Sequence, residues 1–129
     1  MNDYRNAMYD HVSKGIESRF ANITLSSTDF SSKPKLPALQ FVQLDSYVDD
    51  TSSESSNIEV RTICVFEGQA YSAKSYSEAF SIIRECDRLL GSCGFRRTML
   101  SSVDDSDLTI RRVVARWRGA IDTQGRVSR

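Results

Sequence analysis

The sequence predicts an α+β fold, in which two main α-helices pack on one face of a mostly antiparallel β-sheet. Two stretches carry apolar residues at helical spacing, and several others show the alternation or apolar runs of strands. Turns join most of these strands, and one helical connection links two of them. A long acidic loop separates two of the strands. The length of 129 residues favours a single domain over residues 1–129.

The first helix is predicted over residues 3–20, because apolar side chains recur there every four positions. These residues are Tyr4, Met8, Val12, Ile16 and Phe20. Residues 21–25 are a candidate short strand. The stretch 27–37 is rich in serine and has two prolines, so it is predicted to be a loop or an extended edge.

Two strands are predicted over residues 38–48 and 58–71, with a polar, acidic and serine-rich connection, DDTSSESSN, at 49–57. That connection lacks apolar periodicity and good helix formers, so we expect a long loop. The strand at 58–71 contains the apolar run TICVF, which is typical of a central strand. Gly68 suggests a bulge or bend near its end.

The second helix is predicted within residues 72–95, starting at a capping box formed by Ser75 and Glu78. Its apolar stripe comprises Ala79, Ile82, Ile83, Cys86, Leu89 and Leu90. Gly91 or Gly94 is expected to supply the left-handed residue that ends it.

Two closing strands are predicted over residues 95–103 and 107–122, joined by the turn DDSD. The second, DLTIRRVVARWRGAID, has two different faces, because side chains alternate along a strand. One face has Val113, Ala115, Trp117, Gly119 and Ile121. The other has Arg112, Val114, Arg116 and Arg118.

Charge and composition exclude several functional classes. The 17 basic and 17 acidic residues balance, which argues against a protein that mainly binds nucleic acid. No apolar run approaches the roughly 18–20 residues of a membrane span, and the N-terminus does not have the pattern of a signal peptide. Three cysteines, an odd number, favour reduced thiols in a cytoplasm.

No catalytic, cofactor or metal site stands out, so we expect a protein that is not an enzyme. The single histidine, His11, lies at the edge of the first helical stripe, where a structural or solvated role is the simpler reading. Cys93 within GSCG would need a histidine and an orienting partner to act as a nucleophile, whereas helix capping explains the glycines. The acidic stretches lack the spacing of a calcium loop.

The arginines of the last strand allow three readings: a solvated outer face, a nucleic-acid site, or a subunit interface. The candidate residues are Arg111, Arg112, Arg116 and Arg118. An acidic segment, with Asp45, Asp49, Asp50 and Glu54, is a candidate partner for them in an interface. One subunit would then have both complementary surfaces, and a head-to-tail contact of that kind closes into a ring.

The chain from ALQFVQLDSYV to the C-terminal hairpin resembles the tail terminator (tail completion, or minor capsid) proteins of long-tailed bacteriophages. The resemblance lies in the linker AYSAKS after a strand, an amphipathic helix ending at GF and arginine, an acidic turn, and the closing strand IRRVVARW. Residues 4–20 match the family's leading helix. The polar end, TQGRVSR, departs from the aromatic-rich strand usual there, so its pairing as a strand is left open.

The resemblance implies a structural virion protein of the tail neck region, assembled in the host cytoplasm. Such proteins form a ring, typically of six copies, that caps the head-proximal end of the tail tube and stops its growth. The implied partners are other copies, the major tail tube protein, the head–tail connector or stopper and the tape measure protein, with DNA passing only through the lumen. The alternatives are another neck component, such as a head-completion or connector-stopper protein, and a small nucleic-acid-binding protein.

Overall fold

The computed structural model of the chain describes residues 4–28, 34–49, 61–104, 109–121 and 127–128. Within them, the elements follow the order α1 (Tyr4–Arg19), β1 (Thr24–Ser26), β2 (Ala38–Asp49), β3 (Arg61–Ser72), α2 (Tyr76–Gly91), β4 (Arg96–Asp104), β5 (Arg111–Ile121) and β6 (Val127–Ser128). The fold is α+β, as predicted.

The strands form one sheet in the order β1-β2-β3-β5-β4, and β6 also pairs with β5. The β1–β2 pair is parallel and the other pairs are antiparallel. β3 lies in the middle, as its apolar run predicts. The residue pairs between β5 and β6, Ala120–Ser128 and Ile121–Val127, show that Val127 and Ser128 of the C-terminal end pair as a strand.

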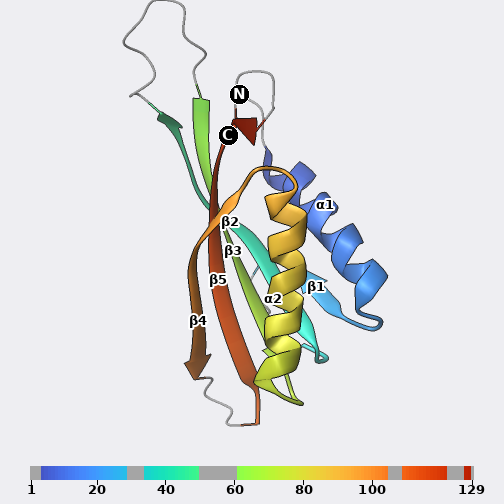
Figure 1. The fold of residues 1–129 in the computed structure, drawn as a ribbon. Coiled ribbons are helices and arrows are strands. Elements are labelled where there is room, and N and C mark those ends of the chain that lie inside the picture. The colour runs from blue at the N-terminus through green and yellow to red at the C-terminus, as the bar shows by residue number, and fades with distance from the viewer. Residues whose placement is uncertain (1–3, 29–33, 50–60, 105–108, 122–126, 129) are drawn as a thin grey trace, which may run out of the picture.

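Both helices lie on the same side of the sheet (Figure 1). Their apolar stripes bury the inner face of the sheet, and the core is one cluster that includes Val12, Ile16, Phe66, Ile83 and Trp117. The Trp117 indole N–H donates a hydrogen bond of 2.8 Å to Asp87 of α2. That bond satisfies the only polar atom of a side chain that is 1 % exposed.

The start of α2 differs from a simple capping box. Ser75 Oγ accepts the Glu78 backbone N–H at 3.2 Å, as predicted. The Glu78 carboxylate instead accepts the Ser72 hydroxyl at 2.6 Å, and the Ser75 N–H donates to Ser72 Oγ at 3.2 Å. The reciprocal half of the prediction is therefore wrong, because the buried Ser72 stands between the two groups.

The left-handed residue that follows α2 is Gly94 and not Gly91. Gly94 has the left-handed φ of 87°, whereas Gly91 is the last helical residue. The Phe95 N–H then donates to the Leu90 carbonyl at 3.0 Å. This closure turns the chain from α2 into β4 and places Phe95 in the core.

The predicted bulge at Gly68 is wrong, because β3 pairs in unbroken register through that residue on both sides. A Cβ there would lie 3.0 Å from Trp117 Cζ3, so the glycine makes room for the indole. The register shifts occur in the outer strands instead, at Leu44 of β2 and at Thr98 of β4. Most of the predicted acidic loop, 49–57, lies outside the described residues.

Candidate functional site

The face of the sheet opposite the helices, called the open face here, is uncovered by any described helix (Figure 1). The strand registers decide which side chains stand on it. Rows of paired residues cross the sheet, and Glu67 of β3 stands opposite Arg116 of β5. Arg112, Arg116 and Arg118 all lie on this face, as the alternation along the last strand predicts.

Two of these arginines are held by hydrogen bonds within the monomer. Arg116 Nε donates to Glu67 Oε2 at 2.9 Å, and Arg112 Nε donates to Gln69 Oε1 at 2.9 Å. Gln69 Nε2 donates in turn to Glu67 Oε1 at 2.7 Å, and the Tyr71 hydroxyl donates to Gln69 Oε1 at 3.0 Å. These five side chains form a hydrogen-bonded ladder along β3 and β5, in which the Glu67 carboxylate compensates the charge of Arg116 and neutral groups hold Arg112.

Arg118 is placed differently. It stands directly opposite Arg96 of β4, and both side chains are exposed. Among the described residues, neither guanidinium has an ion pair or a hydrogen bond. Like charges directly opposite one another on neighbouring strands destabilise a sheet. The two arginines are therefore the part of the open face whose charge is least compensated within the monomer.

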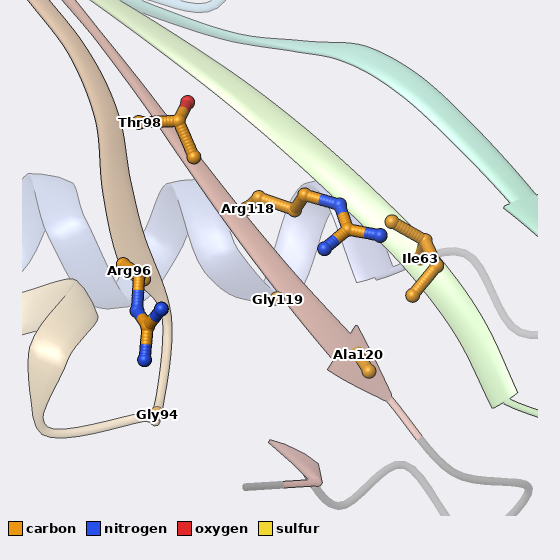
Figure 2. A pocket seen from close by; sticks show the side chains of 7 residues that line it. All are labelled: Ile63, Gly94, Arg96, Thr98, Arg118, Gly119 and Ala120. Carbon is orange, nitrogen blue, oxygen red and sulfur yellow. The ribbon is translucent and has the colours of Figure 1, made fainter.

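A pocket of about 220 Å³ lies beside this pair, lined by Ile63, Gly94, Arg96, Thr98, Arg118, Gly119 and Ala120. Figure 2 shows Arg118 reaching toward Ile63 and Arg96 turning toward Gly94, so the guanidinium groups point apart across the pocket. Ten N–H donors on two such groups suit carboxylate or other oxyanion partners.

Asp45 lies in the same row as the two arginines, but at the other edge. It pairs in register with Val65, which pairs with Arg118, which pairs with Arg96. The exposed Asp45 carboxylate accepts the Ser46 backbone N–H at 2.8 Å. In the described residues it makes no ion pair, so the monomer does not bring Asp45 and the arginines together.

Arg111 does not join the other candidate arginines. Its register partners are Ser72 and Asp104, on the side of the sheet that faces the helices. Its guanidinium lies over the Tyr76 ring at the start of α2, 5.7 Å from the ring centroid. Of the acidic candidates, Asp49 ends β2 and pairs in register with Arg61, whereas Asp50 and Glu54 lie outside the described residues.

Sequence reasoning missed Glu67, Gln69 and Arg96. The first two are polar residues at alternate positions of a strand, a signal that their face meets other polar groups. Arg96 had no such signal, because its position depends on how β4 pairs with β5.

His11 and Cys93, the two weighed as catalytic, have structural contacts. His11 Nε2 donates to the Leu89 carbonyl at 3.1 Å, near the end of α2 where helix carbonyls need donors. Cys93 packs, partly buried, against the core. Among the described residues, no three His, Cys, Asp or Glu side chains gather where they could hold a metal ion.

No described helix is long and apolar enough to cross a membrane. Comparison of the chain with protein-family models gives no match, and comparison with curated proteins gives none either.

Proposed function

We propose that this protein is a structural subunit of a phage tail that assembles as a ring on the head-proximal end of the tail tube, stops tube growth and offers a surface for head joining. Two lines support this function. One is the resemblance of the chain to tail terminator proteins. The other is the exposed and uncompensated charge of Arg96 and Arg118, with Asp45 at the opposite edge of the same row.

That distribution of charge supports self-association for a physical reason. Arginine is enriched in protein interfaces and pairs bidentately with carboxylates. A surface with basic groups at one edge and an acidic group at the other is complementary to a second copy of itself. Because the two surfaces differ, the contact is head-to-tail, and such contacts close into rings when the rotation allows it.

The alternative of nucleic-acid binding is weakened by the polar ladder. Arg112 and Arg116 donate to Gln69 and Glu67, so two of the arginines needed for phosphate contacts are already engaged. A nucleic-acid-binding protein would lose affinity steeply as salt rises. A gel-shift titration with duplex DNA at rising salt tests this, and strong salt-sensitive binding would favour the alternative.

The proposed function is tested by light scattering over a range of concentrations and by mixing with tubes of the tail tube protein from the same phage. We expect oligomers of defined size, in solution or on tube ends, and tubes that stop elongating in electron micrographs. Arg118→Glu should weaken both effects, while Arg84→Glu, an exposed reversal on α2, should not. Binding to the portal or connector without tube capping would instead indicate another neck component.

A further inference from the structure

The described sheet has two open edges. At one, β1 covers only residues 38–40 of β2, so the backbone of residues 41–49 has no described strand beside it. At the other, β4 pairs with β5 on one side and with no described strand on the other. Unpaired edges of this length are templates for pairing with another chain.

The two edge strands match each other in register. Residues paired across the sheet form rows. In the row that contains Arg118, β2 supplies Asp45 and β4 supplies Arg96. In the row that contains Arg116, β2 supplies Val42 and β4 supplies Met99. Between these rows, β3 and β5 each have a single residue. β2 and β4 each have two residues there, because each strand has one extra residue between the same two rows. The extra residue is Leu44 in β2 and Thr98 in β4.

Two copies placed edge to edge bring β4 of one copy beside β2 of the other. β2 and β4 run in opposite directions, so a continued sheet makes them an antiparallel pair. The extra residue on one strand then stands beside the extra residue on the other. The pairing is regular without a bulge, although each strand is bulged against its own neighbour.

The charges agree with this register. In a continued sheet, Arg96 of one copy stands opposite Asp45 of the next, and both lie on the open face. The repulsion between Arg96 and Arg118 is then compensated by a carboxylate. Tyr47, which is 44 % exposed and two residues from Asp45 on the same face, comes beside the pocket next to Arg118.

We infer that residues 96–98 of β4 pair with residues 43–45 of β2 in a second copy of the chain, with Arg96 bound to Asp45. The inference rests on the proposed ring, for which it supplies the contact between subunits. The sheet continues from one copy to the next over these residues. Beyond them β4 turns away from the neighbour's β2, because the neighbour's β1 stands beside residues 38–40, where residues 101–103 of β4 would otherwise lie.

A pair of engineered cysteines tests the register. In a Cys93→Ser background, Asp45→Cys and Arg96→Cys are combined in one chain and oxidised under conditions of self-association. Within one monomer the two positions are three strand spacings apart, about 14 Å, which is too far for a disulfide. We expect a ladder of covalent oligomers on non-reducing gels. The matched control combines Asp45→Cys with Ser102→Cys, an exposed position on the same edge, and should give no ladder.

A charge exchange gives a second, independent readout. Arg96→Asp and Asp45→Arg should each weaken self-association by at least about tenfold, and the double variant should recover most of the loss. Oligomers or capped tubes without the ladder and without recovery would overturn the edge pairing but leave the proposed function standing. A protein that stays monomeric at every concentration and leaves tubes uncapped would overturn both.

Discussion

Arg116 and Glu67 stand opposite each other on β5 and β3, joined by a hydrogen bond of 2.9 Å between Arg116 Nε and Glu67 Oε2. Glu67 is nearly buried, at 8 % exposure, and accepts a second bond from Gln69. Arg118 lies two residues along the same strand and face and has no described partner of this kind. The two arginines therefore differ in their contacts. Arg116 is bound within the monomer, whereas the guanidinium of Arg118 has no described ion pair or hydrogen bond there.

Reversing the charge at these two positions should separate the two roles. Arg116→Glu places a second carboxylate against the nearly buried Glu67, so the free energy of unfolding should fall by about 1–3 kcal/mol. Arg118→Glu should change it by less than about 0.5 kcal/mol, because that position is exposed and its neighbour is Arg96. Urea denaturation of the two variants measures both values. Equal losses would show that Arg118 also has a partner within the monomer.

Gly119 is predicted to be intolerant of a side chain. A Cβ at this position would lie 2.7 Å from Cγ of the Phe95 ring, which is itself buried in the core. Because the contact is with the base of the ring rather than with a flexible end, Gly119→Ala should lower stability by about 1–3 kcal/mol. Thermal or urea unfolding measures the loss.

Gly91 provides the matched control. It is the last residue of α2, and a Cβ there meets nothing within 4 Å. Gly91→Ala should be neutral or raise stability by up to about 1 kcal/mol, since alanine favours the helix. If Gly119→Ala were equally harmless, the Phe95 ring would be able to move away from the added methyl group despite its packing in the core.

The sequence was sufficient for features set by local spacing. Val12 and Ile16 recur at helical intervals and are buried in the core, and Trp117 and Arg118 alternate between the two faces of β5. These patterns depend only on the geometry of the element that contains them. The fold class and the arginine face could therefore be predicted without knowing how distant segments meet.

The rest of the candidate site depends on register between distant strands. Arg116 and Glu67 are 49 residues apart in the chain, and their pairing requires the alignment of β5 with β3. The extra residues Leu44 and Thr98 have no local signal of the kind that glycine gives, and they set which edge residues share a row. For this reason Asp45 could be named as a candidate interface residue from the sequence, whereas Arg96 could not.

The three thiols should differ sharply in reactivity. Burial raises the pKa of Cys86 and of Cys64, and the reactive form of a thiol is its thiolate. Cys93 is the one that is partly exposed. A thiol reagent at pH 8 should therefore modify one group quickly in the folded protein and all three after denaturation.

Cys93→Ser is the variant that identifies the fast group. It should abolish the fast phase of the reaction with the thiol reagent and leave the slow reaction of the two buried thiols unchanged. Cys64→Ser should leave the fast phase in place. A fast phase that survives Cys93→Ser would mean that the sheet or α2 opens readily enough to expose Cys64 or Cys86.

Glu85 of α2 should make stability depend on pH in the acid range. It is 7 % exposed, accepts a hydrogen bond of 2.8 Å from Arg88 Nε, and has Arg19 Nε 3.6 Å away. The bond from Arg88 lowers the pKa of Glu85 below its ordinary value of 4.5. A carboxyl whose pKa is lowered by folding stabilises the protein above its unfolded pKa, and this stabilisation is lost as the pH falls through the folded pKa.

Glu85→Gln removes that contribution while keeping the size of the side chain. The variant should be less stable than the natural protein at pH 7, and the difference should shrink as the pH falls below 4.5. Urea denaturation at pH 7, 5 and 3 measures the two curves. Glu17→Gln, an exposed carboxylate on α1, is the control and should show little difference at any pH. A constant gap between Glu85→Gln and the natural protein across this range would mean that Glu85 acts through packing or neutral hydrogen bonds, because only the ionised carboxylate gains from the two arginines.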